Sequence, residues 1–162
     1  MTLLRYVLVL SLLPVWVAAQ DKAPEQAWIP LCGKCLEPSV NFIAGVGTAH
    51  AEAEGKVTKE DAEGWCANWT PDDKDCVQQQ LQNEAGTTYR ISADCPRGRL
   101  TSFTGDVYKY AGVWTDDDIG KGRPKFRGAD SKVVPRDNAS GGLTLAAQWE
   151  LLCPAKGAAK QN

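Results

Sequence analysis

Six cysteines constrain this chain more than any other feature of its sequence. They are Cys32, Cys35, Cys66, Cys76, Cys95 and Cys153. An even number of cysteines in a small exported protein indicates a disulfide framework rather than a set of reactive thiols. A zinc site is not expected, because the sequence has a single histidine, His50, and a single CxxC motif.

The N-terminus has the pattern of a signal peptide. Arg5 precedes an apolar run from Val7 to Val17, which is well short of the ~20 residues that a membrane-spanning helix needs. Val17 and Ala19 are the small residues expected before a cleavage site. We therefore expect residues 1–19 to be removed, leaving a periplasmic or secreted protein with no membrane span.

The rest of the chain is expected to form one domain over residues 20–153, followed by a flexible tail over 154–162. The full sequence has 18 basic and 20 acidic residues and a formal net charge of −2. A globally basic surface, which nucleic-acid binding favours, is therefore not expected.

Residues 58–85 have the pattern of a helical hairpin. Thr58 and Asp61 resemble a capping box, with Asp in place of the usual Glu or Gln. The residues that follow at the spacing of one helix face are Ala62, Trp65, Cys66 and Trp69. A second helix is expected to begin at Pro71 and to end before Gly86.

Beyond Gly86 the apolar period changes from about 3.6 to 2, which indicates strands. Short strands are expected at 89–95, 99–103, 107–114, 125–127 and 132–134. Leu143, Leu145, Ala147, Trp149 and Leu151 alternate with other residues, and this alternation predicts a last strand over 143–153. The segment 39–54 is ambiguous, since its second half also suits a helix. The expected class is α+β, with the helical hairpin followed by a small antiparallel sheet or barrel-like domain over 87–153.

Two disulfides follow from this layout. Cys66 and Cys76 lie near the bend of the expected hairpin, and Cys95 and Cys153 end two expected strands on their apolar faces. We therefore expect the bonds Cys66–Cys76 and Cys95–Cys153. Whether Cys32 and Cys35 bond to each other stays open.

The CxxC motif at Cys32–Cys35 is a candidate redox pair. A catalytic CxxC needs a thiolate whose pKa is lowered, usually by a helix N-terminus. Pro30 and Pro38 flank this motif, and no βαβ pattern surrounds it. A structural role for these cysteines is therefore favoured over catalysis.

A stripe of cations is the candidate binding feature. Its members are Lys121, Arg123, Lys125 and Arg127, which would project from one side of an extended segment. Such a stripe can receive an anionic glycan or an acidic protein partner. The alternative is that it protects an exposed sheet edge, where alternating cations and a residue such as Pro124 are common.

The remaining candidates are weaker. Asp116–Asp118 and Asp137–Asn138 offer oxygen ligands but lack the spacing of an EF-hand loop, so no metal or cofactor is expected. One histidine and no G-x-S-x-G motif argue against a catalytic triad. Trp65, Trp69 and Trp149 lie on expected apolar faces, whereas Trp28 is expected to be exposed.

Four segments resemble those of a group of small exported proteins of alphaproteobacteria, which has no known function. The segments are Val57–Cys66, Tyr110–Trp114, Arg136–Gly142 and Gln148–Cys153. The resemblance implies a periplasmic or secreted location in a Gram-negative cell. It carries over no activity and no site residues.

Two functions are therefore weighed. The favoured one is a non-enzymatic binding or interaction module of the cell envelope, with a glycan, an anionic ligand or a partner protein as its ligand. The alternative is a thiol–disulfide redox protein that uses Cys32 and Cys35. An accessible bond at a helix end would favour the redox protein.

Overall fold

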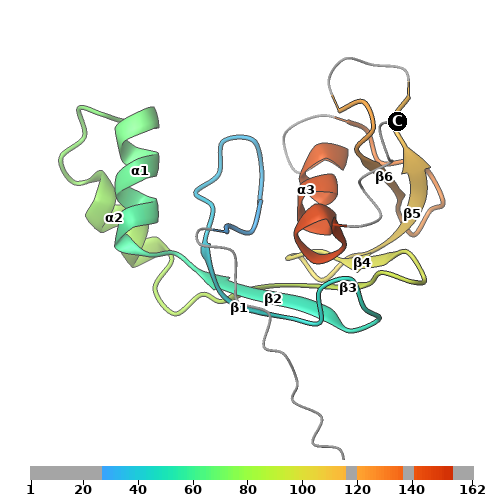
Figure 1. Ribbon diagram of the computed structural model, residues 1–162. Helices are drawn as coiled ribbons and strands as arrows, with labels where there is room; N and C mark the ends of the chain where they lie inside the picture. The colour runs from blue at the N-terminus through green and yellow to red at the C-terminus, as the bar shows by residue number, and fades with distance from the viewer. Residues whose placement is uncertain (1–26, 116–119, 137–140, 155–162) are drawn as a thin grey trace, which may run out of the picture.

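The computed structural model describes residues 27–115, 120–136 and 141–154. In this part of the chain, six strands form one open antiparallel sheet in sequence order, and three helices accompany it (Figure 1). The strands are β1 (Ser39–Ala44), β2 (Ala51–Lys56), β3 (Tyr89–Asp94), β4 (Arg99–Thr101), β5 (Val107–Val113) and β6 (Pro124–Arg127). The helices are α1 (Lys59–Trp69), α2 (Cys76–Asn83) and α3 (Gly142–Leu152). The expected α+β class with an antiparallel sheet is confirmed.

Several expectations fall on other parts of the chain. The signal peptide over 1–19, the oxygen-rich segments 116–118 and 137–138, and the tail beyond Pro154 lie outside the described residues. Within the described residues, none of the helices is both long enough and apolar enough to cross a membrane.

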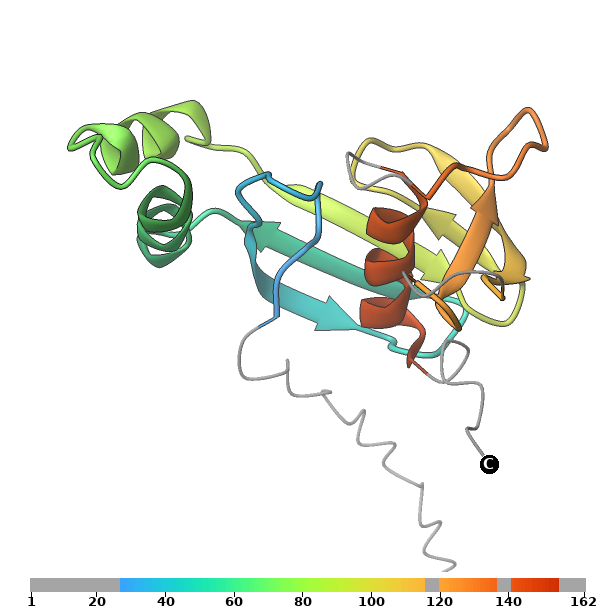
Figure 2. The ribbon, with the colours of Figure 1, turned by 90° about the horizontal axis from the view of Figure 1, so that it is seen from above.

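One face of the sheet carries the hydrophobic core. Neighbouring strands bring matching apolar positions together: Ile43 lies opposite Ala53, and Ala53 lies opposite Ile91. Further along the sheet, Leu100 and Phe126 are fully buried on the same face. Helix α3 lies across this face, as the two ribbon views show (Figures 1 and 2). The outward positions of β2 alternate with the buried ones and are exposed or half-buried, as expected for a sheet with one solvated face.

The expected strand over 143–153 is wrong, because residues 143–152 belong to α3 and Cys153 is the cap at its C-terminus. Leu145, Trp149 and Leu152 are buried at helical spacing. Thr144 and Gln148, which the strand pattern places on the polar face, are buried as well. Apolar residues occupy both alternating phases here, so a period of two does not distinguish a strand from a helix. Leu, Ala, Gln and Glu, which make up most of the segment, all favour helix.

Trp149 is the centre of the core. Its ring is fully buried and lies 5.9 Å from the ring of Tyr110 and 5.6 Å from the ring of Phe126, measured between centroids. Such aromatic pairs add to the free energy gained from burying their area. Helix α3 thus holds β5 and β6 against the rest of the sheet.

The sheet begins earlier in the chain than expected. Residues 51–54 belong to β2, although their sequence also suits a helix, and β1 and β2 precede the helical hairpin. The strand is compatible with the packing because its inward-facing residues, Ala51, Ala53 and Gly55, are small. They leave room for the residues around Ile29 and Ser39, which pack against β2. A Cβ on Gly55 would lie 2.9 Å from the Ser39 carbonyl oxygen and 3.1 Å from the Ile29 side chain.

The expected helical hairpin over 58–85 is present as α1 and α2. Thr58 and Asp61 form the expected capping box: Asp61 N–H donates to the Thr58 hydroxyl, and Thr58 N–H donates to the Asp61 carboxylate. Helix α2 begins at Cys76 and not at Pro71, because residues 70–76 form turns instead. The hairpin stands at one end of the sheet (Figure 2).

Three disulfides join the described residues. The bonds Cys66–Cys76 and Cys95–Cys153 are present as expected, and Cys32 bonds to Cys35. Cys95 directly follows β3, while Cys153 caps α3 and does not end a strand. Three disulfides in a small domain fit an oxidising extracellular compartment.

The Cys95–Cys153 bond is expected to contribute most to stability. The double variant Cys95→Ser/Cys153→Ser should lower the free energy of unfolding by about 4 kcal/mol, because the bond spans 58 positions of the chain. The control is Cys32→Ser/Cys35→Ser, whose bond spans 3 positions and should contribute about 2 kcal/mol in the same chain-entropy treatment. Denaturant unfolding of both variants measures the difference, and an equal loss would contradict this account.

Candidate functional site

A groove of about 550 Å³ lies between the Cys32–Cys35 turn and helix α1. We call it the tryptophan groove, because Trp28, Trp65 and Trp69 all belong to its lining. The lining also includes Lys34, Glu37, Glu60, Asp61 and the Cys32–Cys35 disulfide. The groove lies at the end of the molecule where α1 and the 27–38 segment stand side by side (Figure 1).

Asp61 joins the two walls of the groove. Its carboxylate accepts hydrogen bonds from the Trp28 indole Nε1 (2.9 Å), the Ser39 hydroxyl (2.7 Å), the Ser39 backbone N–H (3.1 Å) and the Thr58 backbone N–H (2.9 Å). Four donors match the lone-pair sites that a carboxylate offers. Asp61 therefore fixes Trp28 and the start of β1 against the N-terminus of α1.

The charge of Asp61 is stabilised in this position. Partial burial acts to raise the pKa of its carboxyl, but the hydrogen bonds from Thr58, Ser39 and Trp28 outweigh this effect and lower the pKa below its usual value. Asp61 is thus a structural anion, and its oxygens are not free for a ligand.

Trp65 holds the CxxC turn against the same helix. Its indole Nε1 donates a hydrogen bond of 2.9 Å to the Lys34 carbonyl oxygen. The Lys34 ammonium lies 5.2 Å from the ring centroid of Trp69, in the geometry of a cation–π contact. The turn between Cys32 and Cys35 is therefore docked on α1 through both its main chain and its side chain.

The tryptophans are more exposed than their helical spacing predicts. Trp69, which we expected in the core, is 47 % exposed, and Trp65 is half-buried. The reason is that α1 buries only a narrow face, formed by Ala62 and Cys66. Trp28 is 42 % exposed, as expected.

The CxxC disulfide is accessible, but it lacks the setting of a reactive thiol pair. Cys35 is exposed and Cys32 is half-buried. The motif forms a turn, closed by the Cys35 N–H on the Cys32 carbonyl at 3.5 Å, and no helix begins there. Glu37 and Glu60 in the same groove bring negative charge, which disfavours a thiolate.

The cation stripe lies on the opposite side of the fold, at the β6 edge, and three of its members contact other residues. Arg123 forms a bidentate ion pair with Glu150 of α3, in which Nε donates to Oε1 at 3.1 Å and Nη2 donates to Oε2 at 2.8 Å. The Lys125 ammonium lies 5.7 Å from the Trp114 ring centroid, and Arg127 donates to the Ser131 carbonyl at 2.9 Å. These contacts fit an edge strand held by its own side chains. Lys121 is exposed and has no ion pair with a described residue.

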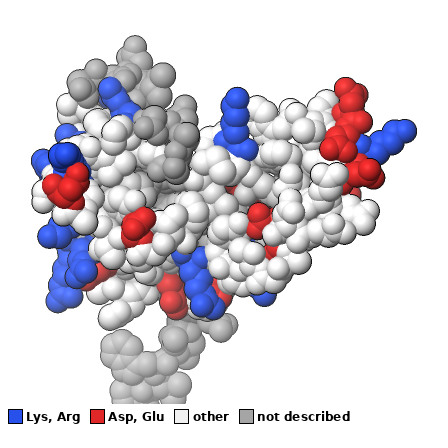
Figure 3. All heavy atoms as spheres, turned by 180° about the vertical axis from the view of Figure 1, so that it is seen from behind, with Lys and Arg blue, Asp and Glu red and all other residues white. Residues whose placement is uncertain are grey.

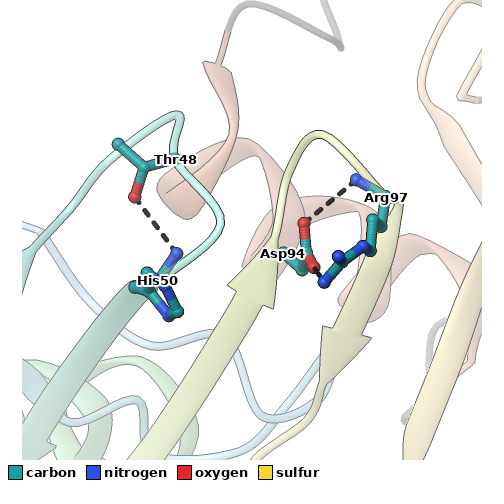
Figure 4. Close-up of polar contacts among 4 residues, drawn as sticks. All are labelled: Thr48, His50, Asp94 and Arg97. Atoms are coloured by element: carbon teal, nitrogen blue, oxygen red, sulfur yellow. Dashed lines mark hydrogen bonds and ion pairs between the residues drawn. The ribbon is translucent and has the colours of Figure 1, made fainter.

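His50 is close to a carboxylate but is not part of a catalytic arrangement. It lies just before β2, near Asp94 at the end of β3 (Figure 4). Asp94 is bound by Arg97, through the backbone N–H at 3.0 Å and Nη1 at 3.2 Å. The His50 imidazole has no hydrogen bond or ion pair with a described residue. His50 and Asp94 border a hollow of about 330 Å³ on the solvated face of the sheet.

Charge is unevenly distributed over the surface. On the face in Figure 3, cationic side chains gather at the end that carries β5 and β6, and acidic side chains gather near the α1–α2 connection. Among the described residues, no group of three or more His, Cys, Asp or Glu side chains is arranged to hold a metal ion.

No protein-family profile matches this sequence, and no curated protein or solved structure is significantly similar to it. The tryptophan groove is the candidate that the sequence did not predict, because its walls come from two segments about thirty residues apart. Trp28 and the CxxC motif were visible in the sequence, but nothing there indicated that they meet α1.

Replacing Asp61 by Asn should destabilise the protein by about 1–3 kcal/mol at neutral pH, because the amide presents an N–H₂ group to donors that need an acceptor. The folded pKa of Asp61 is lowered. Its contribution should therefore be complete above the unfolded-state pKa of about 3.9 and be lost as the pH falls through the folded pKa.

The measurement is denaturant unfolding of the wild type and the D61N variant between pH 2 and 7. The control is Asp72→Asn, which removes the same charge from an exposed position in the α1–α2 connection. A difference between wild type and D61N that does not shrink at low pH would contradict the role given to the Asp61 carboxylate.

Proposed function

We propose that this protein is a non-enzymatic binding module of the cell envelope and that the tryptophan groove is its binding site. The observation that carries the proposal is the groove itself, which has a volume of about 550 Å³. Its lining includes three indoles and the carboxylates of Glu37 and Glu60, which form no hydrogen bond or ion pair with a described residue. Ligand sites are typically concave, rich in aromatic side chains and supplied with a few polar groups. The groove has all three properties.

The way the indoles are held also supports binding. The N–H groups of Trp28 and Trp65 are bonded to Asp61 and to the Lys34 carbonyl, so these rings have fixed orientations while parts of their faces remain exposed. A ligand therefore meets aromatic surfaces that are already ordered, and little side-chain entropy is lost on binding. Preorganisation of this kind is expected of a recognition site.

Location in the envelope is part of the same proposal. The disulfides fit an oxidising compartment. The apolar N-terminal segment has the pattern of a secretion signal, and the resemblance to small exported alphaproteobacterial proteins points to the periplasm or the extracellular space. A glycan or a partner protein of that compartment is the kind of ligand that would reach the groove.

The alternative is a thiol–disulfide redox protein. The observation in its favour is that Cys35 is an exposed residue, bonded to Cys32 and lining the groove. Its test is a disulfide-reduction assay driven by a dithiol reductant, comparing the wild type with Cys32→Ser/Cys35→Ser. Under the binding proposal the two proteins should be equally inactive, and turnover by the wild type alone would support the redox protein.

Trp69 provides the direct test of the groove. We expect the wild type to bind members of a glycan array or a peptide array, and Trp69→Ala to weaken that binding about tenfold or more, because an indole in a binding site contributes on the order of 1.4 kcal/mol or above. Fluorescence-detected titration of the array ligands gives the affinities.

The matched control is Phe42→Ala. Phe42 is 44 % exposed and lies on β1 outside the groove, so its replacement also removes an exposed aromatic ring. Equal loss of affinity in both variants, unchanged binding by the W69A variant, or no ligand on either array would argue against the proposed site.

A further inference from the structure

The tryptophan groove carries more negative than positive charge. Its lining includes three carboxylates and one ammonium group. Asp61 is satisfied by four donors, but Glu37 and Glu60 form no hydrogen bond or ion pair with a described residue. Glu37 is half-buried, and this burial raises the pKa of its carboxyl. A cation in the groove would supply the missing partner.

The aromatic surfaces of the groove favour the same kind of ligand. An ammonium group is attracted to the face of an indole ring, and Lys34 already makes this contact with Trp69 at 5.2 Å. The chain itself therefore shows how a lysine lies on this wall. The N–H groups of Trp28 and Trp65 are engaged elsewhere, so their rings offer a ligand mainly their π faces and edges.

The size and setting of the groove favour an organic cation over an isolated ion or an anion. Its volume of about 550 Å³ is within the range of about 300–1,000 Å³ for organic ligands. The acidic side chains near the α1–α2 connection give this end of the molecule a negative potential that attracts cations (Figure 3). An anionic ligand would meet repulsion both in the groove and around it.

We propose that the tryptophan groove binds a lysine side chain on an exposed segment of a partner polypeptide. This inference rests on the proposed binding function and names the class of its ligand. The methylene stem of the lysine lies along the indoles of Trp65 and Trp69, and its ammonium group pairs with Glu37. Lys34 remains on Trp69 and weakens the binding of a second cation by repulsion.

The first experiment uses two synthetic peptides in isothermal titration calorimetry. One is a blocked five-residue peptide with a central lysine, and the other has norleucine in its place, which keeps the methylene stem and removes the charge. The lysine peptide should bind at least about tenfold more tightly, because the ion pair and the cation–π contact both need the ammonium group.

The second experiment uses variants of the protein with the lysine peptide. Glu37→Gln should weaken binding about tenfold, since it removes the charged partner of the ammonium. Lys34→Met keeps the main-chain carbonyl that accepts from Trp65 and removes the competing charge, so it should tighten binding by about two- to fivefold. The matched control is Glu52→Gln, an exposed carboxylate on β2 outside the groove, which should leave the affinity unchanged.

The outcomes separate this inference from the proposed function. Equal affinity for the lysine and norleucine peptides, or an E37Q variant that binds as the wild type does, would overturn the lysine site. Binding of a neutral oligosaccharide that is lost in the W69A variant, without a response to the lysine peptide, would overturn the inference and leave the binding function standing. The absence of any ligand for the groove on peptide and glycan arrays would overturn both.

Discussion

The carboxylate of Asp61 is the interaction on which the functional end of this molecule depends. It holds Trp28, the start of β1 and the N-terminus of α1 together through four hydrogen bonds. Hydrogen bonds to a charged acceptor are roughly twice as strong as neutral ones. The hairpin stands at the end of the sheet and not on the face that α3 covers, so these hydrogen bonds, with the one from Trp65 to the Lys34 carbonyl, hold α1 against the 27–38 segment (Figure 2).

The 27–38 segment also contacts the hydrophobic core, on the side away from α1. Gln148 of α3 donates a hydrogen bond of 2.7 Å to the Pro30 carbonyl oxygen, and Ile29 is fully buried against β2. Trp65 holds the Lys34 carbonyl from α1. The segment that carries the CxxC turn is therefore fixed by the core at one end and by the helical hairpin at the other. The groove between them is shaped by bonds within the fold and is present before any ligand arrives.

Local signals were readable from the sequence, and so was the long-range Cys95–Cys153 bond, although Cys153 follows a helix and not the expected strand. The long-range contacts that build the groove were not readable. The capping box of Thr58 and Asp61 and the Cys66–Cys76 bond depend on residues close together in the chain, so spacing was enough to predict them. Helix α3 was misread because apolar residues occur in both phases of the segment, and the burial of Thr144 and Gln148 shows that its polar positions do not face solvent as those of the expected strand would. The role of Asp61 beyond its helix was invisible, because its partners Trp28 and Ser39 lie 33 and 22 positions away.

The tryptophans show two different uses of the same side chain. Trp149 is fully buried, and its indole N–H has no hydrogen-bond partner among the described residues. Its ring packs in the core although its N–H group is left without a hydrogen bond. Trp28 and Trp65 are the reverse, since their N–H groups are bonded while their rings keep contact with solvent. Folding stability alone favours burying such large apolar rings. These rings are oriented by hydrogen bonds and left uncovered, and they lie beside the half-buried carboxylate of Glu37, which has no hydrogen-bond or ion-pair partner in the described part of the chain. A ligand that completes these contacts explains the arrangement better than folding stability does.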